Sequence, residues 1–382
     1  MKPYWRAFLF FLPPAALFGV PALLMGLSGE FTAGDTVVAR QQTNPQTLLG
    51  LAYSDSSAYV KARRLAQVHP EVLALGNSRV MQFRSGLFRP GVRFYNAGGA
   101  VSMVQDYRVY LERLAPADWP RFLLIAADDS FFHPSADGES AIKFHLTEQE
   151  RAVTSYSAPV EIYRAQCRKV WADLFAGKIE VRKVLALRGL RDRVGMPAVC
   201  HDQGYRADGS YRYPALDNHV TDPRHRDYQF AHTLSLVQQG AGRFAWGSDV
   251  SQQSLQEFDR FLDFCQAHRI HVIGFSPPSP HAVCAAMQAL GEKYAYVPKV
   301  HAALQARLTA RGFEYYDLSD FTAVQAPDDE AIDGFHGSER TYLRLVIHML
   351  EHGSRLNEVA DLPHLREVLR AATKQDELPY GG

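Results

Sequence analysis

The stretch Val72-Leu73-Ala74-Leu75-Gly76-Asn77-Ser78-Arg79 decides the fold expected for this chain. An apolar run ends in Gly, a small polar residue and Ser, which is typical of a buried strand that stops at a tight turn before a helix. The hydroxyl of Ser78 would then lie at a helix start, where free N–H groups and the helix dipole favour developing negative charge. Ser at a helix start is also ordinary capping chemistry. The stretch alone therefore leaves both interpretations open, a nucleophile and a cap.

The pattern around this stretch predicts an α/β fold. Short apolar, β-rich runs recur along the chain, at residues 72–75, 92–95, 122–126, 271–275 and 313–317. Amphipathic helical segments lie between several of them, at residues 103–114, 252–268 and 296–310. Such alternation favours a three-layer, doubly wound parallel sheet with helices on both faces. In such sheets ligands bind outside the carboxyl ends of the strands, where Ser78 is expected.

One long insertion, residues 133–252, interrupts the alternation and far exceeds an ordinary connection. Asp208-Gly209 within it predicts a hairpin turn. A lid or substrate-binding subdomain and a solvated excursion are equally compatible with this segment. Four parts are expected along the chain. They are a flank and membrane anchor (1–27), a connector (28–70), the α/β domain with its insertion (71–352) and a C-terminal helix with a disordered end (353–382).

The N-terminus predicts a single membrane anchor. Lys2 and Arg6 precede residues 7–27, which are uncharged, almost wholly apolar and about long enough to span a bilayer. Pro13, Pro14 and Pro21 are better tolerated in a transmembrane helix than in a soluble one. The positive flank places the N-terminus in the cytoplasm and the rest outside. The segment is long for a cleaved signal peptide, and a buried N-terminal helix is the other alternative.

Composition excludes some functions. Lys plus Arg equals Asp plus Glu, at 41 each, so no basic field predicts nucleic-acid binding. No metal-ligand spacing such as HExxH occurs, and we expect neither a metal nor another cofactor. No CxxC pair occurs either, so no zinc or redox motif is indicated. The sequence does not decide whether the four cysteines form two disulfides or are buried free thiols; they are Cys167, Cys200, Cys265 and Cys284.

A second motif, Asp333-Gly334-Phe335-His336, follows the last predicted strand. An Asp and a His three residues apart can share one turn, where His accepts a proton from a serine and Asp fixes its tautomer. Because Ser78 follows the first strand, both loops open at the same edge of the sheet. Asp333 as a cap of the helix that begins near Ser338 is the simpler alternative.

Two further strand ends reach the same edge. Asn96-Ala97-Gly98 follows the second strand, and a glycine there lets a backbone N–H approach an oxyanion closely. Asp128 and Asp129 follow the third strand. A glycine-rich turn and a turn cap are the structural alternatives for these two stretches.

The ordered set of motifs resembles the SGNH (GDSL-type) hydrolase superfamily, over about residues 71–350 without the insertion. The resemblance implies that Ser78 is the nucleophile and that its own N–H and the N–H of Gly98 form the oxyanion hole. It further implies that His336 is the general base and Asp333 its orienting partner.

The sequence departs from that pattern after the third strand. The superfamily usually has Gly-x-Asn-Asp there, and this chain has Ala126-Ala127-Asp128-Asp129. A carboxyl group donates a hydrogen bond only when protonated, which requires a raised pKa. Either the hole has two donors, or Asp128 or Asp129 binds substrate hydroxyls or holds Arg79. The departure disfavours a fast, general esterase.

The anchor, the Gly-Asn-Ser-Arg stretch and Pro277-Pro278-Ser279-Pro280-His281 resemble, more specifically, membrane-anchored branches of the superfamily. These include the teichoic-acid D-alanylation protein DltD and alginate acetylation proteins. The resemblance implies an O-acyltransferase that modifies a cell-surface glycan outside the bacterial inner membrane, beside a multi-spanning membrane O-acyltransferase (MBOAT). His281 would line the pocket or merely begin a helix. A carbohydrate esterase and a catalytically idle docking protein are the alternative functions.

Overall fold

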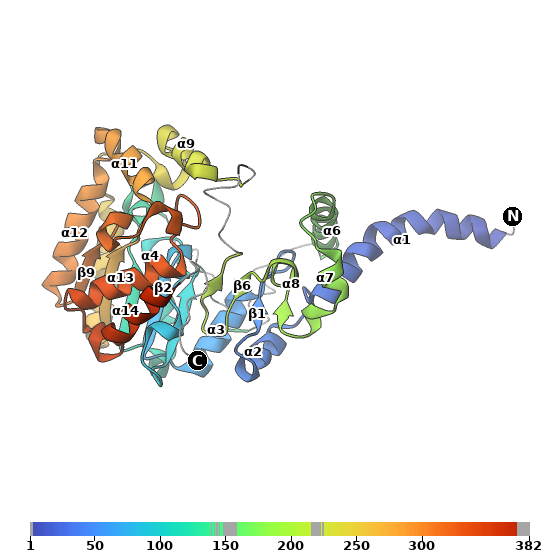
Figure 1. Ribbon diagram of the computed structural model, residues 1–382, viewed down its shortest axis with the longest axis horizontal. Helices are drawn as coiled ribbons and strands as arrows, with labels where there is room; N and C mark the ends of the chain where they lie inside the picture. The colour runs from blue at the N-terminus through green and yellow to red at the C-terminus, as the bar shows by residue number, and fades with distance from the viewer. Residues whose placement is uncertain are drawn as a thin grey trace. The chain divides into compact units, whose positions relative to one another are not determined.

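The computed structural model describes residues 3–138, 140, 142, 144, 146–147, 159–214, 223 and 225–372. The chain divides into two compact units (Figure 1). Met1–Arg64 and Phe144–Ala207 form the N-terminal unit, and Leu65–Lys143 and Asp208–Gly382 form the sheet unit.

The sheet unit contains five parallel strands in the order β3-β2-β4-β8-β9. Their bounds are Val72–Gly76 (β2), Phe94–Gly98 (β3), Phe122–Ala126 (β4), His271–Ser276 (β8) and Glu314–Asp317 (β9). All five predicted strands are confirmed, although β3 begins later than predicted because the Val92 N–H closes a turn onto the Arg89 carbonyl. Numbered along the chain, the order is 2-1-3-4-5, which is compatible with a doubly wound α/β fold.

Helices of the sheet unit confirm the predicted amphipathic segments. The predicted ones are α4 (Val104–Glu112), α10 (Gln252–Ala267), α12 (Tyr296–Ala310) and α14 (Leu362–Ala371). Helix α13 (Glu339–Glu351) confirms the helix predicted to begin near Ser338, and α11 (His281–Ala289) begins at His281, as one of the two interpretations of that residue has it. Helix α9 (Ala231–Gln239) was not predicted. Ser338, and not Asp333, caps α13, because its hydroxyl accepts the Thr341 N–H. Asp333 is therefore available for another task.

The N-terminal unit is built from two distant segments (Figure 1). Its helices are α1 (Pro3–Ser28), α2 (Gly34–Thr43), α6 (Pro159–Phe175), α7 (Val181–Leu185) and α8 (Met196–His201). Strand β1 (Leu48–Leu49) pairs with β5 (Arg193–Val194) and β6 (Gly204–Tyr205). Helix α1 packs against α6, α7 and α8, and Leu24 and Met25 near its end are buried. Helix α3 (Ser57–Val68) continues the chain into the sheet unit, to which β7 (Tyr211–Arg212) also belongs.

A buried carboxylate joins the two segments of the N-terminal unit. Glu30 is 3% exposed and accepts backbone N–H groups from Ala52, Tyr53, Ser54 and Met196. The predicted connector at residues 28–70 is therefore wrong in part, because it contributes α2 and this core. The predicted insertion is also not one piece, since residues 144–207 and 208–252 belong to different units. Local sequence patterns cannot show that distant segments share a core.

The structure also bears on the expected transmembrane helix and on the four cysteines. Among the helices of the described residues, none combines the length and the apolar character needed to cross a membrane, so the transmembrane helix expected over residues 7–27 is not supported. The disordered end falls on residues 373–382, outside the described residues. All four cysteines are free thiols, and three of them are buried.

The residues around Val80 explain why the chain turns sharply after β2. The short 3-10 helix η1 (Ser78–Val80) follows the strand, and Val80 packs on the strand ends. A Cβ atom on Gly76 or Gly98 would lie 2.9 Å from a Val80 methyl group, so only glycine fits at either position. Asn96 is fully buried and donates from Nδ2 to the carbonyls of Val80 (2.7 Å) and Phe83 (2.9 Å). The Asn-x-Gly motif thus fixes η1 against β3.

We therefore predict that Asn96→Asp destabilises the protein by about 3 kcal/mol, because two buried carbonyls lose their donor and face a buried charge. Urea denaturation followed by circular dichroism measures the change. Asn357→Asp, at an exposed position, is the control. Equal stability of the two variants would contradict the role assigned to Asn96.

Candidate active site

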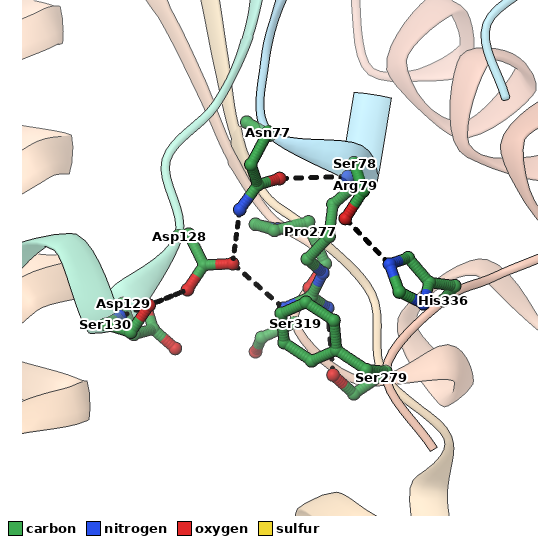
Figure 2. Close-up of polar contacts among 12 residues, drawn as sticks. Asn77, Ser78, Arg79, Asp128, Asp129, Ser130, Pro277, Ser279, Ser319 and His336 are labelled. Atoms are coloured by element: carbon green, nitrogen blue, oxygen red, sulfur yellow. Dashed lines mark hydrogen bonds and ion pairs between the residues drawn. The ribbon is translucent and has the colours of Figure 1, made fainter. Parts of the chain in front are cut away.

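Ser78, His336 and Asp333 form a continuous chain of hydrogen bonds. Ser78 begins η1, and the other two residues lie in the loop between β9 and α13. The Oγ of Ser78 lies 2.8 Å from Nε2 of His336, and Figure 2 draws this contact as a dashed line. The Nδ1 of His336 lies 2.9 and 3.0 Å from the two carboxylate oxygens of Asp333. This is the order and connectivity of a Ser-His-Asp triad.

Asp333 is held ionised. Its Oδ1 accepts the backbone N–H groups of Phe335 and His336, each at 2.8 Å. Burial raises the pKa of Asp333, but the hydrogen bonds and charge of His336 and these two N–H groups outweigh it and lower the pKa to about 2. An ionised Asp333 accepts a hydrogen bond from Nδ1–H of His336, and this tautomer leaves Nε2 as the acceptor for the Ser78 hydroxyl.

The loop that carries Asp333 and His336 is itself anchored. The Gly334 N–H donates to Oδ2 of Asp227 at 2.7 Å, and Asp227 also accepts the N–H and hydroxyl of Thr233. Asp227 is buried. Sequence analysis missed it, because nothing in the sequence near residue 227 points to a loop about 100 residues later.

Arg79 fixes η1 to the neighbouring strand ends. Its side chain is 7% exposed and donates to the Pro277 carbonyl (2.6 Å) and Ser279 Oγ (2.8 Å). One guanidinium nitrogen lies 3.5 Å from the Asp128 carboxylate (Figure 2). The Arg79 carbonyl accepts the hydroxyl of Tyr342. The residue after the candidate nucleophile is therefore held at both its backbone and its side chain.

Asp128 is an acceptor in this network. Its carboxylate accepts from Asn77 Nδ2 at 3.2 Å and from the N–H and hydroxyl of Ser130 (Figure 2). Burial raises the pKa of Asp128, but Arg79, Ser130, Arg243 and Asn77 together outweigh burial and lower it. A protonated Asp128 that donates to an oxyanion is therefore not supported. Of the alternatives predicted for it, holding Arg79 fits the geometry.

The oxyanion hole is sparser than expected. The Ser78 N–H has no acceptor in the part of the chain that the structure describes. The Gly98 N–H, in contrast, already donates to Asn96 Oδ1 at 2.8 Å. The geometry thus gives no support to Gly98 as the second donor, because the amide oxygen two residues earlier occupies its N–H. Loss of one oxyanion donor typically costs about 10²–10³-fold in rate.

Asp129 belongs to a second polar cluster. The Nε2 of His301, in α12, lies 2.8 Å from Asp129, and its Nδ1 lies 2.9 Å from Asp317 at the end of β9. Burial lowers the pKa of His301, but the two carboxylates outweigh it and raise the pKa to about 10. Burial raises the pKa of Asp317, and His301 and Ser319 lower it overall to about 2. A charged imidazolium therefore links the ends of β4 and β9.

A cavity of about 410 Å³ lies at these strand ends, within the size range of small-molecule sites. Strands β4, β8 and β9, helices α11 and α12, and the loop before His336 contribute to it. Its charged and aromatic lining includes Arg79, Asp128, Asp129, Arg243, His301 and Phe335. Arg243 comes from the insertion, and neither it nor His301 carries a motif that sequence analysis could have found.

His281 does not line this cavity. Its side chain is 57% exposed, and its Nδ1 lies 3.0 Å from Asp320. Its backbone N–H and that of Ala282 donate to Asp328. Of the two interpretations of His281, the geometry supports the helix start and not the pocket, because the residue begins α11 and its imidazole contacts Asp320.

We predict that Asp333→Asn slows the labelling of Ser78 by a fluorophosphonate probe by about 10³–10⁴-fold, because an amide neither fixes the tautomer nor stabilises the imidazolium. Labelling rates by mass spectrometry test this. Asp329→Asn, at an exposed position four residues earlier, is the control. Equal labelling of both variants would exclude Asp333 from the triad.

The His301 cluster predicts a pH dependence of stability. A folded pKa of about 10 exceeds the ordinary value of 6.5, so the stabilisation is complete below pH 6.5 and is lost as pH rises towards 10. The free energy of unfolding of wild type should therefore exceed that of His301→Gln most at low pH, and this difference should shrink by a few kcal/mol across the window. The size follows because each unit of pKa shift corresponds to about 1.4 kcal/mol. Urea denaturation at pH 6, 8 and 10 measures it, with the exposed His364→Gln as control. A difference that stays constant would refute the charged cluster.

The chain matches no protein-family model, no curated protein and no solved structure. Its function must therefore be inferred from its own residues.

Proposed function

We propose that this protein is an O-acyltransferase in which Ser78 carries a small acyl group as an ester and passes it to a glycan hydroxyl. The observation that supports this most is the continuous hydrogen-bonded chain from Ser78 Oγ through His336 to Asp333. Such a chain activates a serine that is otherwise a weak nucleophile.

The first half-reaction forms the ester. Oγ of Ser78 attacks the acyl carbon while His336 Nε2 takes the hydroxyl proton, and Asp333 stabilises the imidazolium. The bond between the acyl carbon and the leaving group breaks, and His336 returns the proton to that group. In the second half, His336 takes a proton from a hydroxyl of the acceptor, whose oxygen attacks the acyl carbon. The bond between that carbon and Oγ breaks, and His336 returns the proton to Oγ of Ser78.

A sparse oxyanion hole slows attack by water and by a glycan hydroxyl alike, so a positioned acceptor decides between the two. The Ser78 N–H has no acceptor among the described residues, and the Gly98 N–H is occupied, so little of the rate enhancement comes from stabilising the oxyanion. Positioning of a bound acceptor is the remaining large contribution. The cavity, whose lining includes Arg79 and Phe335 next to Ser78 and His336 in the chain, provides room for such an acceptor. The superfamily relationship, the location outside the inner membrane and the MBOAT-type partner stay predictions from resemblance.

One alternative has a specific observation in its favour. Gly98 and Asp128 occupy the motif positions of oxyanion donors, yet one N–H is taken and the other side chain is an ionised acceptor. A non-catalytic protein that docks a polymer or a partner would tolerate both changes. An esterase that uses water as acceptor would follow the same steps as the transferase.

Labelling and transfer assays on the purified full-length chain separate these functions. A fluorophosphonate probe should label wild type and the exposed-serine control Ser248→Ala, but not Ser78→Ala. With 4-nitrophenyl acetate as donor and a soluble glycan as acceptor, mass spectrometry should then detect acetylated glycan, and only when Ser78 is present. No labelling would favour the docking protein, and release of acetate without acetylated glycan would favour the esterase.

A further inference from the structure

One backbone donor of the loop that carries Asp333 and His336 is bound from outside the loop. The Asp333 carboxylate accepts the N–H groups of Phe335 and His336, so these two donors are used within the loop. The Gly334 N–H, in contrast, donates to Oδ2 of Asp227 at 2.7 Å. The tip of the loop is therefore tied to a residue that lies 107 positions earlier in the chain.

Asp227 and Thr233 together form the seat for this loop tip. Asp227 is buried, and the oxygen that binds Gly334 also accepts the Thr233 hydroxyl at 2.7 Å, while the other oxygen accepts the Thr233 N–H at 2.9 Å. Hydrogen bonds to a carboxylate are roughly twice as strong as those between neutral groups. Thr233, in α9, also packs directly on the loop, because a Cβ atom on Gly334 would lie 2.4 Å from the Thr233 Cβ.

The same half of the insertion contacts the two residues that end the loop. The guanidinium carbon of Arg243 lies 3.9 Å from the centre of the Phe335 ring. The rings of Tyr213 and His336 lie 5.9 Å apart, centre to centre. The sequence left open whether the insertion is a lid, a substrate-binding subdomain or a solvated excursion. Contacts with three consecutive residues of the triad loop favour a scaffold for that loop.

The chain between Asp227 and Thr233 is strained. Gln229 and Phe230 are both in the left-handed region, with φ of 49° and 59°. Residues with side chains avoid this region, and two in succession persist only where the surrounding structure imposes them. The Phe230 N–H donates to the Asp227 carbonyl at 2.8 Å, which closes the turn. Helix α9 follows directly and packs on α11, so the strained turn fixes Asp227 to the sheet unit (Figure 1).

We propose that Asp227 is a positioning residue of the triad, which holds the Gly334 N–H and so keeps His336 and Asp333 in place relative to Ser78. The inference rests on the proposed function, because it concerns the same triad. The geometry of His336 can nevertheless be measured whether or not Ser78 reacts. A displacement of about 1 Å between reacting groups costs about 10²-fold in rate, so a loosened loop tip should slow the reaction strongly.

Two substitutions disturb this contact from opposite sides. Asp227→Asn places an amide NH₂ group against one of the three donors that the carboxylate accepts, and Gly334→Ala adds the Cβ atom for which Thr233 leaves no room. Asp106→Asn is the matched control, because Asp106 is also a buried aspartate that accepts two backbone N–H groups, at the start of α4. Urea denaturation shows how far each full-length variant is destabilised.

Two measurements report on the triad. The first is the rate of Ser78 labelling as a function of fluorophosphonate concentration, and the second is the exchange with water of the His336 Nδ1–H in ¹⁵N-histidine NMR. In Asp227→Asn and Gly334→Ala the maximal labelling rate should fall about tenfold or more, with the half-saturating concentration unchanged, and the Nδ1–H should exchange faster. The double variant should lose no more than the worse single one, because both changes break one contact.

The control separates positioning from stability alone. Asp106→Asn should lower the free energy of unfolding and leave both triad measurements unchanged. Equal losses in Asp106→Asn would overturn the inference, as would unchanged labelling or unchanged exchange in Asp227→Asn and Gly334→Ala. Failure of the probe to label wild type would reject the proposed function, and the exchange of the His336 Nδ1–H would then decide alone whether Asp227 positions the loop.

Discussion

The buried ion pair between Arg79 and Asp128 is the constraint on which the candidate site depends. A guanidinium that is 7% exposed needs a counter-charge and hydrogen-bond acceptors, and here Asp128, the Pro277 carbonyl and Ser279 serve its two terminal nitrogens, while its Nε has no partner among the described residues. Because Arg79 follows Ser78 directly, these contacts hold η1 against the ends of β4 and β8. Removing one partner of such a pair typically costs about 3–5 kcal/mol, since the other charge stays buried and uncompensated. The position of the serine is thus a consequence of electrostatics at the neighbouring strand ends.

Several motif residues that suggest chemistry have structural tasks instead. Asn96 binds the carbonyls of η1, Gly98 makes room for Val80, and Asp128 holds Arg79. What remains for chemistry is Ser78 with its own N–H, His336 and Asp333. If Ser78 and His336 act as the proposed nucleophile and base, substrate positioning must supply what the few oxyanion donors do not.

The sequence predicts the parts of this molecule that follow from local patterns and one topological rule. Apolar runs locate the strands, and the rule that parallel strands end at one edge brings Ser78 and His336 together over more than 250 residues. The N-terminal unit was not predictable, because its core joins segments that share no pattern. His301 and Arg243 were missed for a related reason: each sits in an unremarkable helical or loop stretch and gains meaning only from partners elsewhere. The transmembrane helix expected over residues 7–27 is likewise not supported by the helices of the described residues.

The two consecutive aspartates at the end of β4 illustrate how the site departs from the superfamily it resembles. Asp128 turns to Arg79 and Asp129 turns to His301, so each carboxylate stabilises a different buried cation. An asparagine at position 128, as the superfamily usually has there, would offer an oxyanion donor but leave the Arg79 guanidinium without its counter-ion. A donor at that position and an arginine after the serine are therefore incompatible in this arrangement. The missing donor is the consequence of the same ion pair that positions Ser78, and the two features must be explained together.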